Sequence, residues 1–176
     1  DGDTAKNLLD LLYDPIKAQI VANADVITIS IGGNNILKAG KNSFSLIDHQ
    51  MAEEGTLAFE NDYPLIIERI RELNSNAKIV AMTLYNPYNT VSIRYYTDDP
   101  KLHEEVKPYV TRINAKILGV EDNNYRVADV YTHFLINYAN KGKMGDVTYF
   151  YPSALFKFTR DPHPNQTGQN EMVKIH

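Results

Sequence analysis

Three short apolar runs rich in β-branched residues occur at residues 26–31, 78–84 and 125–130. Runs of this composition predict β-strands. The first run ends at Gly32-Gly33 and the second is stopped by Asn86-Pro87, so both have sharp carboxyl ends. Because the first two runs do not alternate strictly between apolar and polar residues, we expect these strands to be buried on both faces of a sheet.

Between these runs, the apolar residues follow helical spacing. The segment 4–21 carries a leucine-rich face behind the N-cap residue Thr4, and Pro15 breaks or kinks it. A second helix is expected over 61–73, with Pro64 in its first turn. A third helix is expected where Val106, Val110, Ile113 and Ile117 share one stripe, and Pro108 lies in its first turn or kinks it. The last helix begins at Asn165. Residues 85–100 form a tyrosine-rich loop.

Helices that alternate with buried strands predict an α/β fold, a three-layer α/β/α sandwich with a parallel sheet and one domain over residues 1–176. In such sheets ligands bind beyond the carboxyl ends of the strands. That rule directs attention to residues 32–35, to residues 85–89 and to the loop expected after residue 131. Residues 38–58 are polar and give no clear pattern.

Composition excludes several classes of protein. The net charge of −4 leaves no basic field for nucleic acid, and no apolar run approaches the roughly 18 residues of a transmembrane segment. Cysteine is absent, which excludes disulfides, thiolate metal sites and a cysteine nucleophile. The histidines show no metal-ligand pairing, so we expect no metal, and four of them are interpreted as structural: His49, His103, His133 and His176.

Three polar motifs could carry chemistry. Asn34, in the sequence Gly32-Gly33-Asn34-Asn35, could donate its amide N–H to an oxyanion, although Gly and Asn are also common in ordinary turns. His163 lies between two prolines, on a stiff loop that suits a general base and equally suits a surface turn. Gly2, just before a helix, could add a backbone N–H to an oxyanion site, but this signal has no weight alone.

Taken in order, the three motifs resemble the SGNH (GDSL-type) hydrolase family of esterases, lipases and acylhydrolases. The resemblance implies that Gly2 and Asn34 form the oxyanion hole, that His163 is the catalytic base and that Asp161 orients it. Pro164 matches the proline that follows the family's histidine. The stretch Leu84-Tyr85-Asn86-Pro87-Tyr88 resembles the bacterial lipase/acylhydrolase branch. Tyr85 and Tyr88 could belong to the core or line an acyl or sugar pocket, and we favour the pocket because they follow a strand at its carboxyl end.

The chain departs from the family pattern at three points. The family places its acid three residues before the histidine, where Arg160 stands, whereas Asp161 lies two residues before it; a backbone carbonyl could orient the ring instead. Asn35 occupies the usual position of an aspartate. The family's first block, Gly-Asp-Ser, is missing, and none of the serines lies in a strand-to-helix elbow: Ser30, Ser43, Ser45, Ser75, Ser92 and Ser153.

We therefore interpret the chain as this domain without its first strand, first helix and second strand, and incomplete at its C-terminus. The run 26–31 would then leave a bare sheet edge, which we expect to pair with the missing segment or with another chain. A stable, monodisperse monomer in solution would contradict that expectation.

The resemblance implies serine-dependent hydrolysis of carboxylic esters by a protein whose serine lies upstream, with this segment inactive alone. It also implies a small-molecule, lipid or carbohydrate ester as substrate, no cofactor, and an extracellular or cell-surface location. The alternative is a catalytically inactive binding module that keeps the cleft. A flavodoxin-like nucleotide binder is disfavoured, because no glycine-rich phosphate loop follows any predicted strand.

Overall fold

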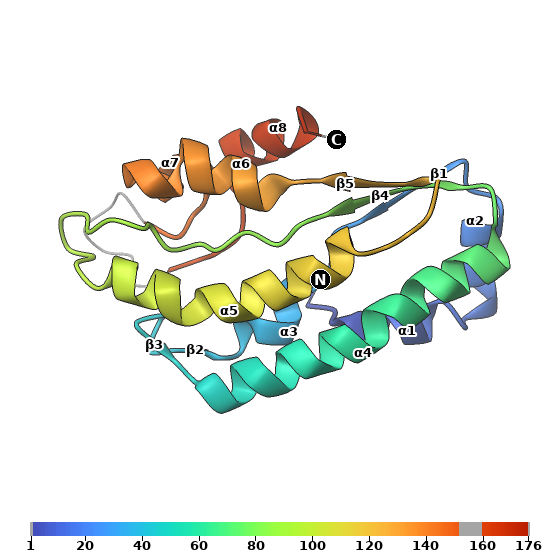
Figure 1. Cartoon of the computed structure of the whole chain (residues 1–176), viewed down its shortest axis with the longest axis horizontal. Helices are drawn as coiled ribbons and strands as arrows, with labels where there is room; N and C mark the ends of the chain where they lie inside the picture. The colour runs from blue at the N-terminus through green and yellow to red at the C-terminus, as the bar shows by residue number, and fades with distance from the viewer. Residues whose placement is uncertain (1, 152–159, 176) are drawn as a thin grey trace.

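The computed structural model describes residues 2–151 and 160–175. Its centre is a parallel sheet of three strands in the order β1-β4-β5, formed by Val26–Ile29, Lys78–Met82 and Tyr125–Ala128. β1 pairs with β4 from Val26↔Lys78 onward, and β4 pairs with β5 from Ile79↔Tyr125 onward. Helices lie on both sides of this sheet (Figure 1), which confirms the predicted α/β class.

The other elements follow in chain order. They are α1 (Ala5–Leu11), α2 (Pro15–Ala22), α3 (Gly33–Leu37), β2 (Gly40–Lys41), β3 (Leu46–Ile47), α4 (His49–Leu73), α5 (Asp99–Leu118), α6 (Val130–Asn137), the 3-10 turn η1 (Ala139–Lys141), α7 (Met144–Val147) and α8 (Gln166–Val173). β2 and β3 form a short antiparallel hairpin. No helix in the described part of the chain has both the length and the apolar composition needed to cross a membrane.

The main core lies between one face of the sheet and helices α1, α4 and α5. Phe59 and Ile66 of α4 and Ile113 of α5 are fully buried there against Ile79 of β4. A second cluster packs α6 and α7 around Phe134 at the carboxyl end of the sheet. The main core thus covers one face of the sheet, and the second cluster lies beside the carboxyl ends of the strands.

Burial of β1 differs from the prediction. Only Ile29 of this strand is buried, and 54% of Val26 is exposed. β1 is one of the two edge strands of this sheet, so in the described residues no strand covers its free edge. The prediction of burial on both faces was therefore wrong for β1, because a β-branched run records strand propensity and does not record how many neighbours a strand has.

α4 is longer than predicted. It begins at His49 rather than at residue 61, and the carboxylate of Asp48 accepts the Met51 N–H at 3.0 Å as its N-cap. Pro64 consequently lies inside the helix and not in its first turn. An interior proline costs about 3 kcal/mol, and burial of side chains on both halves of α4 outweighs that cost.

Pro108 lies well inside α5, whose first turn contains Pro100, so the first of the two alternatives given for Pro108 is excluded. One other boundary was wrong. The loop expected after residue 131 is the helix α6, which Asp129 caps by accepting the Thr132 N–H at 3.1 Å. Asp129 follows the third strand immediately, so strand and helix adjoin with no loop between them. By contrast, the expected caps Thr4 and Asn165 begin α1 and α8 as predicted.

His103 provides a pH-dependent contribution to stability. Its side chain is buried on α5, and Nδ1 donates a hydrogen bond to the Tyr88 carbonyl at 3.0 Å. Burial lowers the pKa of His103 below its usual range, so the folded protein holds this ring neutral. Below pH of about 6.5 the unfolded chain binds a proton at this residue and the folded chain does not.

The free energy of unfolding should therefore fall as the pH drops from 7.5 to 5.5, by at most about 1.4 kcal/mol per pH unit from this residue. Urea unfolding of the wild type and of His103→Gln at both pH values checks this, and the variant should show the smaller difference. His49→Gln is the matched control, because that ring lies at the surface beside Tyr109. An equal pH difference in wild type and His103→Gln would contradict the assignment.

Candidate active site

A cavity of about 470 Å³ opens at the carboxyl ends of β1 and β4. This is the position at which parallel α/β sheets bind ligands. Asp3, Asn34 and His163 line it, and they come from three segments that are far apart in the sequence. The rest of its wall is largely apolar and includes Ile29, Ile31, Met82, Leu84, Phe44 and Val110.

Gly32 makes the turn that directs the following residues toward this cavity. Its φ of +110° lies in the left-handed region, and a Cβ at this position would lie 2.9 Å from the Phe59 ring. Both the backbone conformation and the packing therefore require glycine. Gly32 is also the N-cap of α3, so the turn places Asn34 in the first turn of that helix, at the wall of the cavity.

The side chain of Asn34 connects two of the sequence motifs. Its Nδ2 donates to the Asp3 carbonyl oxygen at 3.1 Å. An amide nitrogen carries two hydrogens, so one N–H remains for a ligand. Gly2 has a left-handed φ of +88° and adjoins Asp3, but Gly2 itself does not line the cavity. The structure thus brings the segment 2–4 to Asn34 and puts Asp3, not Gly2, at the wall.

Asn35 has a different environment from its neighbour. Its Oδ1 accepts the Ala5 N–H at 3.0 Å, and its Nδ2 donates to the Gly55 carbonyl at 3.2 Å. A Cβ at position 55 would lie 1.8 Å from the Asn35 carbonyl oxygen, so α3 and α4 approach each other closely there. Asn35 therefore joins the starts of α1 and α3 to the middle of α4, and the position has a structural role here.

His163 and Asp161 form a close pair. Nδ1 of His163 lies 2.6 Å from Oδ1 of Asp161, and the same oxygen accepts the His163 backbone N–H at 2.9 Å. A carboxylate can only accept, so Nδ1 carries the proton and Nε2 is left as the basic nitrogen. In the described part of the chain Nε2 has no hydrogen-bond partner, and 71% of the side chain is exposed.

Several contacts hold the loop that carries this pair. The Tyr85 hydroxyl donates to the Pro162 carbonyl, between Asp161 and His163. On the other side the Tyr149 N–H donates to the His163 carbonyl at 3.0 Å. Asn165, just after the loop, accepts the Gly168 N–H at 3.0 Å and caps α8. The imidazole thus projects from a backbone that is fixed on both sides.

Tyr85 and Tyr88 both line the cavity, and each hydroxyl group donates to a backbone carbonyl. The Tyr88 hydroxyl donates to the Phe44 carbonyl at 2.8 Å, which attaches the β2–β3 hairpin to the tyrosine-rich loop. Burial raises the pKa of Tyr85 and of Tyr88 well above the usual value. Both phenols therefore stay protonated at neutral pH and act as donors.

No serine in the described residues is hydrogen-bonded to His163, and Ser30 is the one serine there that lines the cavity. Ser153 lies outside the described residues. The other described histidines are bound elsewhere: His103 to Tyr88, His133 to Glu171 at 2.9 Å, and His49 to Tyr109 at 3.0 Å. His176 is also outside the described residues.

The β2–β3 hairpin was not predicted, although Phe44 and Ile47 line the cavity. Its turn has three consecutive residues with positive φ, Asn42, Ser43 and Phe44, at 47°, 54° and 65°. Asn-Ser is a turn signal, but a bulky residue in the left-handed region is unusual. The Tyr88 hydroxyl and the Arg160 guanidinium donate to the Phe44 carbonyl at 2.8 and 3.4 Å and hold this conformation. Sequence patterns do not reveal such contacts.

The structure is similar to solved structures of other proteins. A lipase, Lip_vut3, from a goat rumen metagenome has a crystal structure that matches with a TM-score of 0.66 at 18% identity, over 98% of this chain and 71% of that one. The salicylyl-acyltransferase SsfX3 from a tetracycline biosynthetic pathway matches with a TM-score of 0.48 at 16% identity, over 97% of this chain and 41% of that one. The first likeness confirms the fold.

One curated relative is the uncharacterized protein YpmR of Bacillus subtilis (strain 168), which is 30% identical over 87 residues. That match covers 49% of this chain and 34% of YpmR, so it spans about a third of the relative. The profile of the GDSL-like lipase/acylhydrolase family matches residues 2–175, which is nearly the whole sequence. This chain therefore belongs to the GDSL-like lipase/acylhydrolase family.

Proposed function

We propose that the protein hydrolyses carboxylic esters with an apolar acyl group by a serine-dependent mechanism. The observation that carries the proposal is the His163–Asp161 pair at 2.6 Å on the wall of the same cavity as Asn34. A base with a fixed tautomer and an amide donor facing one cavity are the parts that acyl transfer requires. Family membership supports the same chemistry.

In this mechanism His163 Nε2 removes the proton of the serine hydroxyl as its oxygen attacks the ester carbonyl. Asp161 holds the ring and stabilises the imidazolium that forms. Asn34 Nδ2 donates to the oxyanion of the tetrahedral intermediate. The second donor that the family resemblance implies is the backbone N–H of Gly2, which precedes Asp3 of the cavity wall and does not itself line the cavity. The imidazolium then gives its proton to the departing alkoxide. Water, deprotonated by the same ring, attacks the acyl-enzyme, and the acid and free serine are released.

The cavity supports an apolar acyl group. At about 470 Å³ it is within the usual size range of small-molecule sites. Its polar side chains include Asp3, Asn34 and His163, with Thr28 and Ser30 near the end of β1, whereas aliphatic and aromatic side chains dominate the wall. Tyr85 and Tyr88 contribute ring surface, because both hydroxyl groups are occupied by backbone carbonyls. An ester with its carbonyl near Asn34 would place its hydrocarbon part against this wall.

We place the nucleophilic serine outside this sequence. No Gly-Asp-Ser occurs in the 176 residues, and Ser30 directly follows β1 rather than lying in a strand-to-helix elbow. In this proposal the longer gene product supplies the serine, and its segment pairs with the free edge of β1. The second candidate function, an inactive binding module, rests on the same absence of a Gly-Asp-Ser motif.

The test is the intact mass of the longest product of this gene before and after treatment with a serine-reactive fluorophosphonate. We expect one adduct, on a serine that precedes residue 1, and the same adduct in a Ser30→Ala variant. An adduct that disappears in Ser30→Ala would place the nucleophile inside this sequence. A full-length product that gains no mass would favour the binding module.

A further inference from the structure

Arg160 is a buried cation immediately before the loop of Asp161 and His163. Its side chain is 9% exposed. The guanidinium carbon lies 4.4 Å from the centroid of the Tyr96 ring, 5.0 Å from that of Phe150, and within 5.8 Å of two more tyrosine rings, those of Tyr88 and Tyr151. Arginine above an aromatic ring gains energy from the ring quadrupole, more so where water is excluded.

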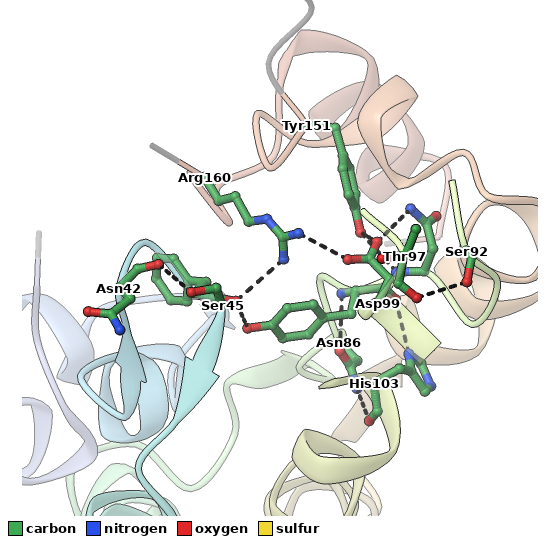
Figure 2. Close-up of polar contacts among 12 residues, drawn as sticks. Asn42, Ser45, Asn86, Ser92, Thr97, Asp99, His103, Tyr151 and Arg160 are labelled. Atoms are coloured by element: carbon green, nitrogen blue, oxygen red, sulfur yellow. Dashed lines mark hydrogen bonds and ion pairs between the residues drawn. The ribbon is translucent and has the colours of Figure 1, made fainter. Parts of the chain in front are cut away.

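The partner of this cation is Asp99, the first residue of α5, whose side chain is fully buried. Arg160 donates to its Oδ1 at 3.1 Å, and Asn89 and Tyr151 donate to Oδ2 (Figure 2). Burial raises the pKa of Asp99, whereas the hydrogen bond from Tyr151 and the charge of Arg160 act in the opposite direction. The carboxylate thus has a donor on each of its oxygens.

A buried ion pair of this kind is a costly way to stabilise a fold. Both charges lose their hydration, and apolar side chains of the same volume often serve stability as well or better. The pair does supply a fixed geometry, because the planar guanidinium fork has few orientations that satisfy its partners. Arg160 also donates to the Phe44 carbonyl at 3.4 Å, so its direction is set from two sides.

The ion pair of Arg160 and Asp99 is connected to His163 by a very short segment of chain. Only Asp161 and Pro162 separate Arg160 from His163, which is at most about 11 Å of extended backbone. The Pro162 ring removes one backbone rotation from this link. Downstream of Arg160 the Asp161 N–H donates to the Tyr149 carbonyl at 3.4 Å, and the Tyr85 hydroxyl donates to the Pro162 carbonyl. A shift of Arg160 would therefore move the Asp161 carboxylate relative to the imidazole that it orients.

We propose that Asp99 and Arg160 are positioning residues for His163: the buried ion pair fixes the start of the loop and so keeps the Asp161 carboxylate on His163 Nδ1. The proposal rests on the proposed function for its catalytic consequence, whereas its structural consequence can be measured without any substrate. Arg160 occupies the position where the family resemblance placed the acid, and it holds the loop from outside the cavity.

The test compares His163 in the wild type, in Asp99→Leu/Arg160→Met and in Arg160→Lys. Nitrogen-15 shifts of the imidazole show which ring nitrogen carries the proton, with His163→Gln used for assignment. We expect the Nδ1–H tautomer in the wild type and a mixture with Nε2–H in the double variant. Arg160→Lys keeps the charge but loses the planar fork, so it should give an intermediate mixture and serves if the double variant does not fold.

Arg112→Met is the matched control. Arg112 of α5 binds Glu53 and Glu60 of α4 at 2.6–2.9 Å, which is an equally close ion pair with no contact to the His163 loop. It should leave the His163 tautomer as in the wild type. Wild-type His163 signals in both Arg160 variants, or an equal change in Arg112→Met, would overturn the proposal.

Kinetics give a second readout in the gene product that carries the serine. We expect kcat to fall roughly 10- to 100-fold in Arg160→Lys with KM nearly unchanged, since a misplaced base slows chemistry without weakening binding. If the wild type hydrolyses no ester, the proposed function fails, and the tautomer comparison still decides whether Arg160 positions His163.

Discussion

Replacing His163 with glutamine is expected to lower kcat for ester hydrolysis by about a millionfold, the loss that follows when the histidine base of a serine hydrolase is removed. Glutamine fills similar space and can still accept a hydrogen bond, but it cannot take the proton of the serine hydroxyl. The side chain is 71% exposed and packs in no core cluster. The free energy of unfolding should therefore change by less than about 0.5 kcal/mol.

His133→Gln is the matched control for this variant. His133 of α6 also donates to a carboxylate, Glu171 of α8, at 2.9 Å, but it does not line the cavity. Hydrolysis of a p-nitrophenyl ester by the serine-bearing gene product should be nearly normal in His133→Gln and undetectable in His163→Gln. Equal rates in the two variants would remove His163 from the mechanism.

Asp161→Asn tests the orienting role separately. The amide could present its N–H to Nδ1 and favour the wrong tautomer, so kcat should fall by about 10⁴-fold with little change in KM. The rate should respond less to this variant than to His163→Gln. If hydrolysis were unaffected, a backbone carbonyl would have to orient the ring, which was the second possibility that the sequence left open.

The sequence predicted those parts of the fold that depend on local patterns. The three strands, the caps Thr4 and Asn165, and the break at Pro15 follow from β-branched runs, side-chain acceptors and the missing N–H of proline. It did not predict the first half of α4, because a proline at position 64 suggests a helix start and only tertiary burial shows otherwise. The same limit applies to the exposure of β1, which depends on its place in the sheet.

For the candidate site, the family resemblance pointed to His163, Asp161 and Asn34. In the structure His163 and Asn34 line one cavity, and Asp161 is hydrogen-bonded to His163. The contacts that hold them were not predictable. In the sequence Arg160 is only a departure from the family pattern, and no motif marks Asp99, whose side chain is fully buried. Both depend on the folding of residues 85–98 around them, a segment with no periodicity to interpret.

The adjacent residues Asn34 and Asn35 should show opposite effects when each is replaced with alanine. Asn34→Ala removes a donor to the oxyanion, which exists only in the transition state, so kcat should fall about 10²- to 10³-fold and KM should hold. Stability should decrease by only about 1 kcal/mol, the value of the single hydrogen bond to the Asp3 carbonyl.

Asn35→Ala removes an acceptor from the Ala5 N–H and a donor from the Gly55 carbonyl, two half-buried backbone groups that no other side chain reaches in the described residues. The Ala5 N–H loses its acceptor, whereas the Gly55 carbonyl lies inside α4 and keeps the hydrogen bond of its own helix. The variant should therefore lose about 1–3 kcal/mol of unfolding free energy. The rate per folded molecule should stay within a few-fold, because Asn35 does not line the cavity.

Urea unfolding and steady-state hydrolysis of both variants therefore distinguish a catalytic role of Asn34 from a structural role of Asn35. A loss of rate in Asn34→Ala that came with an equal loss of stability would mean that the segment 2–4 had detached from α3, and that Asn34 acts by holding Asp3. If Asn35→Ala lost the rate and Asn34→Ala kept it, the donor to the oxyanion would be the second asparagine, and the turn at Gly32 would have to present it differently to the cavity.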